Sequence, residues 1–131
     1  MLKYFCFVFI LLCFANIQLY SLTDDNQELA LLNAAFDGDT NEVIRLIESG
    51  NDPNLQAQGG FTPLMYASGN GHLETVKTLV ENEADVNIRP ENGKTALFGA
   101  VLGNHYEVTL YLLQNGAETE VRDNLGVTPL L

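Results

Sequence analysis

The amino-acid sequence predicts an all-α repeat solenoid, in which helix-turn-helix units stack on one another and are joined by extended hairpin loops. The first observation is a tetrapeptide that returns at equal intervals, as Thr62-Pro63-Leu64-Met65, Thr95-Ala96-Leu97-Phe98 and Thr128-Pro129-Leu130-Leu131. The second is an apolar pattern with helical spacing after each copy. Self-similarity at this period is typical of a stacked array in which each unit contacts its neighbours.

Length and composition fit about three such units in one domain. The chain has 131 residues, of which 47% are hydrophobic and 18% charged, which is a globular composition. Six basic and seventeen acidic side chains give a net charge of −11. This charge argues against binding of nucleic acid or of an anionic membrane surface, and it favours partners with a basic surface. The two cysteines, Cys6 and Cys13, lie near the N-terminus, so no disulfide framework or metal knuckle is expected elsewhere.

Residues 1–21 have the pattern of a secretory signal peptide. Lys3 is basic, residues 4–14 form an unbroken apolar run, and Ala15 is a small residue after which cleavage is favoured. The pattern predicts export, with the mature protein periplasmic or secreted. The alternative is an uncleaved membrane anchor over residues 4–22, although polar residues interrupt that stretch.

The remaining residues, 22–131, form the predicted repeat domain. A polar stretch at its start marks the boundary with the targeting segment, and the first repeat begins there. Aligning the copies by their period places Leu29 under Thr62 and Gly38 under Gly71. The predicted repeats span about 24–56, 57–89 and 90–122, with a partial fourth over 123–131.

The first helix of each unit has start and stop signals. In the central copy Thr62 is suited to cap the helix, and Pro63 fits the first turn, where its missing N–H costs nothing. The helix is predicted to end at a left-handed residue, which is Gly71 in this copy. Gly38 is equivalent in the first copy and Asn104, which tolerates that conformation, in the third.

The second helix is predicted from an apolar stripe, with charged residues off the stripe facing solvent. In the central copy the stripe consists of Leu73, Val76, Leu79 and Val80. Gly50 and Gly116 stand where this helix must stop, whereas the middle copy has Glu83, so strain or fraying is expected there. Turn-forming residues follow and lead through an extended hairpin to the next Thr.

Several motifs keep their mutual spacing: Gly60-Phe61-Thr62-Pro63-Leu64, Gly71-His72-Leu73-Glu74, Val76-Lys77, Leu79-Val80 and Ala84-Asp85-Val86-Asn87. Together these motifs resemble an ankyrin repeat. The resemblance covers roughly residues 24–131 and implies the ankyrin fold.

The chain departs from the family pattern in several places. Met65, Phe98 and Leu131 replace the family's histidine after Pro-Leu, which implies weaker hydrogen bonding and stronger apolar packing between repeats. Residues 118–120 lack the Asn of the central copy, and the first copy resembles a capping repeat. Because the sequence stops within the first helix of a fourth repeat, we expect a fragment of a longer array, the alternative being a frayed tail.

No residue pattern indicates catalysis, a cofactor or a metal site, and the sequence is interpreted as non-enzymatic. His72 and His105 occupy equivalent positions, which favours a repeated structural role over metal binding. The acidic residues near Glu81 lack the ligand spacing of a calcium loop and are interpreted as a solvated rim. An enzymatic function would need a further domain.

The resemblance implies binding of a partner protein through hairpin tips and the concave face. Carried over position by position, the candidate partner-binding residues are Gln58, Phe61, Asn70, Glu91, Asn92, Lys94, Leu102, Asp25 and Phe36. Phe61 is the preferred apolar anchor, while Phe36 and Leu102 fit edge packing between repeats equally well. The predicted function is an exported interaction module; the alternatives are an accessory scaffold that protects an exported enzyme and a membrane-tethered scaffold.

Overall fold

The computed structural model describes residues 25–129, and within them the chain is helical with connecting loops. Residues 25–37 form the first helix. The elements that follow are α2 (Thr40–Glu48), the short 3-10 helix η1 (Gln58–Gly60), α3 (Pro63–Gly69), α4 (Leu73–Glu81), α5 (Ala96–Leu102) and α6 (Tyr106–Gln114). The described residues contain no β-strand. The predicted all-α solenoid is confirmed.

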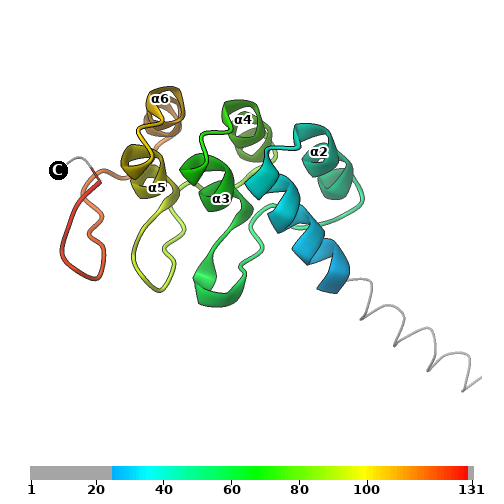
Figure 1. Ribbon diagram of the computed structural model, residues 1–131, viewed down its shortest axis with the longest axis horizontal. Helices are drawn as coiled ribbons and strands as arrows, with labels where there is room; N and C mark the ends of the chain where they lie inside the picture. Colours follow the sequence, from blue (N-terminus) through cyan, green and yellow to red (C-terminus); the bar gives the residue numbers. More distant parts are fainter. Residues whose placement is uncertain (1–24, 130–131) are drawn as a thin grey trace, which may run out of the picture.

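The helices form two rows (Figure 1). One row contains α2, α4 and α6, and the other contains the helix over 25–37, α3 and α5; the three long loops project from the second row. The rows arise because α3 packs on α5, and α4 packs on both α2 and α6. Each unit therefore contacts the next, as a solenoid requires.

The core repeats with the sequence. Its largest fully buried side chains are leucines at equivalent positions of successive units: Leu31, Leu64 and Leu97 in the first helices, and Leu46, Leu79 and Leu112 in the second. Burying one leucine side chain stabilises a fold by roughly 1.5–3 kcal/mol relative to leaving it exposed. One continuous apolar core therefore runs along the stack.

The start and stop signals of the first helices act as predicted, with one exception. The hydroxyl of Thr62 accepts a hydrogen bond from the backbone N–H of Met65 at 3.3 Å. Gly71 has φ +76°, and Asn104, its counterpart in the third unit, has φ +58°. Thr95 occupies the N-cap position of α5, but its side chain accepts no capping hydrogen bond.

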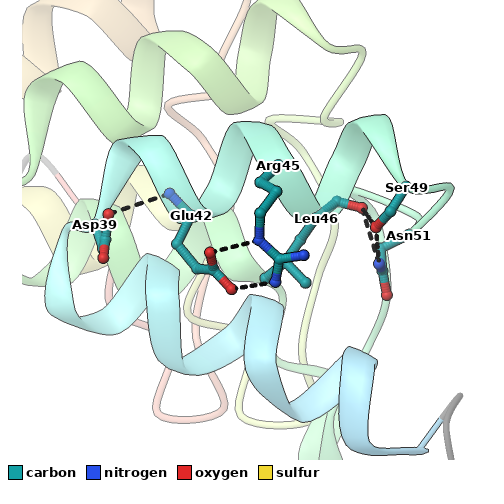
Figure 2. Close-up of polar contacts among 6 residues, drawn as sticks. All are labelled: Asp39, Glu42, Arg45, Leu46, Ser49 and Asn51. Atoms are coloured by element: carbon teal, nitrogen blue, oxygen red, sulfur yellow. Dashed lines mark hydrogen bonds and ion pairs between the residues drawn. The ribbon is translucent and has the colours of Figure 1, made fainter.

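Helix α2 has polar contacts near both ends (Figure 2). At its start the Asp39 carboxylate accepts a hydrogen bond from the backbone N–H of Glu42 at 3.1 Å. Near its end the side-chain amide of Asn51 donates to the carbonyl oxygen of Leu46 at 2.8 Å. Arg45 donates two hydrogen bonds to the Glu42 carboxylate, which holds the pKa of Glu42 below its ordinary value of 4.5.

The second helices end at left-handed residues. Gly50 and Gly116 have φ +104° and +87°, and Glu83 takes the same role in the central unit with φ +68°. A side chain in this conformation is strained. The expected strain at Glu83 is therefore present, and the turn is retained by a hydrogen bond from the Ala84 N–H to the Leu79 oxygen at 3.0 Å.

The loops of residues 25–129 lack the paired strands of the hairpins that the sequence predicts. The backbone N–H of Ala57 donates to the Phe61 oxygen at 2.8 Å, and that of Glu91 reaches the Gly59 oxygen of the preceding loop at 2.9 Å. These isolated bonds close each turn and join neighbouring loops. They are too few in succession to form a β-ladder, which explains why residues 25–129 contain no strand.

The start of the first repeat differs from the prediction. The alignment treats residues 25–28 as a hairpin, whereas the structure has a helix over 25–37. The physical reason is that this copy lacks the Thr-Pro pair that begins α3, and its Asp, Gln and Glu residues are compatible with the start of a helix. The predicted signal peptide lies outside the described residues.

Side-chain hydrogen bonds join successive units despite the histidine replaced in each first helix. The Asn54 amide donates to the Glu83 oxygen at 3.0 Å, and its own oxygen accepts from the Asp85 N–H at 2.7 Å. Asn87 repeats both bonds, to the Gly116 oxygen at 2.9 Å and from the Glu118 N–H at 2.8 Å. These asparagines restore polar contacts that the sequence departures alone do not predict.

Candidate partner-binding surface

A groove between the second and third units brings together four of the nine predicted partner-binding residues: Phe61, Asn70, Asn92 and Lys94. It contains a hollow of about 240 Å³ between α3, α5 and the loops that precede them. We call it the α3–α5 groove. Its lining consists of Phe61, Met65, Tyr66, Gly69, Asn70, Asn92, Lys94, Thr95 and Gly99.

Two glycines open the α3–α5 groove. Gly69 is equivalent to Phe36 and Leu102 in the neighbouring units, and Gly99 is equivalent to Tyr66. A Cβ atom added at Gly69 would meet nothing within 4 Å, and one added at Gly99 would lie 3.4 Å from the Gly69 Cα. The large side chains of the other units are therefore missing where α3 and α5 approach each other.

Aromatic rings form one side of the groove. The Tyr66 ring lies between two others, with its centroid 6.1 Å from that of Phe36 in an edge-to-face arrangement and 6.0 Å from that of Phe61. Phe61 is half-buried, while Phe36 is 52% exposed. Phe61 and Phe36, two of the three candidate anchors, thus belong to one aromatic cluster with Tyr66, whereas Leu102 does not.

Tyr66 is the residue that the sequence reasoning missed. It stands on α3 between the buried Met65 and Ala67, and its counterpart Gly99 has no side chain, so the periodic pattern gives it no signal. A comparison of the repeats for positions that alternate between aromatic and glycine would have found it.

The two asparagines of the groove also have structural contacts. The Asn70 amide donates to the Phe36 carbonyl oxygen at 2.9 Å. The Asn92 side-chain oxygen accepts from the Lys94 backbone N–H at 2.9 Å, which fixes the loop that positions Lys94. The Lys94 ammonium lies 5.6 Å from the centroid of the buried Phe98 ring.

The other predicted residues lie around the groove or away from it. Gln58 is exposed in η1, and Glu91 is exposed on the next loop, whose backbone bonds to Gly59. Leu102 is 63% exposed at the end of α5. Asp25 is exposed but helical, so its expected placement at a hairpin tip is wrong, and a role in binding stays a prediction for it.

A larger hollow, of about 390 Å³, lies on α5 and α6 and includes Val101 and Thr109 in its lining. The equivalent residues of the second unit, Ser68 and Val76, are completely buried, and the helices of the third unit pack on those of the second. This hollow therefore belongs to the face on which one unit stacks upon another. The predicted partner-binding residues Phe61 and Lys94 lie in the smaller α3–α5 groove, which we take as the candidate site.

The histidines act within the stack. The Nε2 atom of His72 lies 2.9 Å from the Phe36 carbonyl oxygen, and that of His105 lies 2.9 Å from the Gly69 oxygen. Each ring thus bonds to the preceding unit, as their repeated positions predict. Residues 25–129 contain no group of three or more side chains suited to hold a metal ion, and no helix long and apolar enough to cross a membrane.

Helical hairpins stacked on their neighbours define a repeat solenoid, an architecture whose extended concave surfaces commonly bind partners. A family model described as ankyrin repeats in three copies matches residues 4–90 and 31–123. The chain belongs to the ankyrin repeat family. Members of this family are in general protein-interaction modules and are typically non-enzymatic. No curated protein matches the chain.

Proposed function

We propose that this chain is an exported, non-enzymatic module that binds one partner protein through the α3–α5 groove and the loop tips beside it. The observation that carries the proposal is the hollow opened by Gly69 and Gly99 between Phe61 and Lys94. An apolar hollow with a few polar groups at its edge is the usual form of a binding site.

The aromatic cluster supports the groove as the centre of the interface. Aromatic side chains that become buried supply much of the binding energy of protein interfaces. Tyr66 and Phe61 contact each other and line the hollow, so a partner side chain inserted there would be enclosed on one side by rings. Phe36 extends the same surface toward the first unit.

The charge of the chain supports a partner with a basic surface. The net charge is −11, and Glu91 lies exposed on the loop next to the groove. Such a field accelerates association with a cationic partner and disfavours nucleic acid. Raising the salt concentration should therefore slow association more than it speeds dissociation.

Export rests on the signal-like pattern of residues 1–21, with an anchor over 4–22 as the alternative. Fractionation of the source cells followed by N-terminal sequencing of the mature protein tests it. A free protein that begins near residue 16 or 22 supports export. Recovery of an intact N-terminus in the soluble cytoplasmic fraction contradicts it.

The binding surface is tested by site-directed photo-crosslinking in the native compartment. A photoreactive residue at Gln58, beside the groove, should capture the partner, whereas one at the exposed Glu81 of α4 should not. The captured partner is then purified and its affinity measured. The double variant Phe61→Ala, Glu91→Lys should weaken binding at least about tenfold, which corresponds to 1.4 kcal/mol.

A second variant covers the case in which Phe61→Ala harms the fold. Gly69→Leu adds a side chain at a lining position where the Cβ atom meets nothing within 4 Å, so the new side chain would occupy the hollow. Its thermal melting should match that of the wild type while partner binding falls. Unchanged affinity in both folded variants would show that the partner binds elsewhere.

A further inference from the structure

The α3–α5 groove differs in charge from the rest of the molecule. Its lining contains one cation, Lys94, and no carboxylate. The chain as a whole is strongly acidic. At short range Lys94 therefore attracts a negative group of a bound partner, although the net charge of the chain attracts positive groups at long range.

Lys94 is also distinguished by its lack of an acceptor. Within residues 25–129, Arg45 and Lys77 pair with glutamates. Arg89 and Arg122 donate to backbone carbonyl oxygens. Lys94 is half-buried, and its ammonium lies over the Phe98 ring without an oxygen partner among the described residues. An ammonium in this setting gains more from an incoming anion than one that is already paired.

A second group in the wall of the groove is also unsatisfied. Thr95 lines the hollow and is 3% exposed, and its hydroxyl has no hydrogen-bond partner among the described residues. Buried hydroxyls are normally hydrogen-bonded, because an unmade bond costs free energy. This oxygen is itself buried, so the charged group of the groove that faces a bound partner is Lys94.

We infer that the α3–α5 groove recognises a partner segment in which an aspartate or glutamate stands next to a large apolar side chain. The apolar side chain fills the hollow beside Tyr66, and the carboxylate meets Lys94. The inference rests on the proposed function and adds the chemistry of the bound residues. The lining of the groove contains no arginine, whereas phosphorylated motifs are usually held by arginine clusters, so the proposed anion is a carboxylate.

Lys94 and the net charge of the chain together define one pattern for the partner. An acidic residue alone would be repelled by the chain's net charge during approach. Basic residues on either side of it restore attraction and come close to exposed carboxylates such as Glu91. The expected segment is therefore apolar and acidic at its centre and basic at its flanks.

The test uses three blocked peptides, acetyl-Arg-Leu-X-Arg-amide, with Glu, Gln or Lys at X. They are titrated into ¹⁵N-labelled protein, and the amide signals of Gly69 and Gly99 report on the groove. The Glu peptide should bind about three- to tenfold more tightly than the Gln peptide, and the Lys peptide most weakly. In Lys94→Glu the order should reverse, and in Lys94→Gln the preference for the Glu peptide over the Gln peptide should disappear.

Matched controls separate a local effect from a change in net charge. Lys77→Glu makes the same change in net charge on α4, away from the groove, and should keep the order of the wild type. Gly69→Leu should remove the changes in the Gly99 signal with all three peptides. Melting curves establish that each variant is folded.

Three results would each overturn the inference. They are equal affinities of the Glu and Gln peptides, an order of affinities that is unchanged in Lys94→Glu, and amide signals of Gly69 and Gly99 that no peptide changes. The proposed function is judged separately, by capture from Gln58 and by the Phe61 and Gly69 variants. If a partner loses affinity in the Phe61 and Gly69 variants but not in the Lys94 variants, the carboxylate inference is wrong and the proposed binding surface still holds.

Discussion

The Nε2 atom of His105 lies 2.9 Å from the carbonyl oxygen of Gly69, a residue of the preceding unit. The same ring covers Gly71, because a Cβ atom added there would collide with the imidazole. The histidine is thus hydrogen-bonded to one glycine and packed on another. His72 has the equivalent relationships with the first unit, to Phe36 and Gly38. The packing of His105 on Gly71 and of His72 on Gly38 therefore holds successive repeats together.

The first prediction concerns the packing of His105 on Gly71. Gly71→Ala should lower the free energy of unfolding by about 2–4 kcal/mol, because it adds a methyl group against the ring and forces a side chain into a left-handed backbone, φ +76°. Gly116→Ala is the matched control, since its φ is +87° but nothing lies near its Cβ; it should cost about 1–2 kcal/mol. Urea unfolding measures both. Equal losses would mean that the ring moves aside freely.

The second prediction concerns the asparagine that joins the last two units. Asn87→Asp should lower the free energy of unfolding by about 1–3 kcal/mol, because a carboxylate cannot donate to the Gly116 oxygen and repels it. Asn82→Asp is the control, since Asn82 donates only within its own unit, to the Thr78 oxygen. Chemical denaturation should show the smaller loss for Asn82. A reversed order would contradict the role of Asn87 between units.

The third prediction concerns a buried hydroxyl that has no partner. Ser68 is fully buried, its hydroxyl is unbonded among the described residues, and the equivalent Ala35 is equally buried. Ser68→Ala should therefore stabilise the protein by about 1 kcal/mol. Thr75→Val is the contrasting case, because the Thr75 hydroxyl bonds that of Thr40 at 2.8 Å, and it should destabilise. Thermal melting compares the two, and a loss of stability in Ser68→Ala would refute the assignment.

The fourth prediction concerns pH. The hydrogen bonds from Arg45 lower the pKa of Glu42 in the folded state, so this carboxylate stabilises the fold above its ordinary pKa of 4.5, and the contribution disappears as the pH falls through the lowered value. Wild type should melt slightly above Glu42→Gln at neutral pH, with the difference closing below pH 4.5. The effect is small because both groups are exposed, and salt should reduce it further. Arg45→Gln should give the same pattern. A difference that persists in acid would contradict it.

Local signals in the sequence predicted most of the scaffold. The Thr62 cap, the left-handed Gly71 and the structural role of His105 each depend on chemistry within a few residues or on exact repetition. The helix over 25–37 was missed because the alignment transferred a hairpin to a copy that lacks the residues that form it. Partner-binding roles were assigned by position, and the structure gathers only some of those residues into one groove.

By itself the sequence determined the repeat, its helices and the core leucines, because these depend on periodic residues that act alike in every unit. Only the tertiary structure decided where the chain is hollow. Gly69 and Gly99 are far apart in the sequence, and each is unremarkable within its own repeat. Stacking of α3 on α5 brings them together, so two missing side chains combine into one groove beside Tyr66 and Lys94. Features shared by every unit can be predicted from the sequence of each repeat, whereas a site between two units forms only when those units pack together.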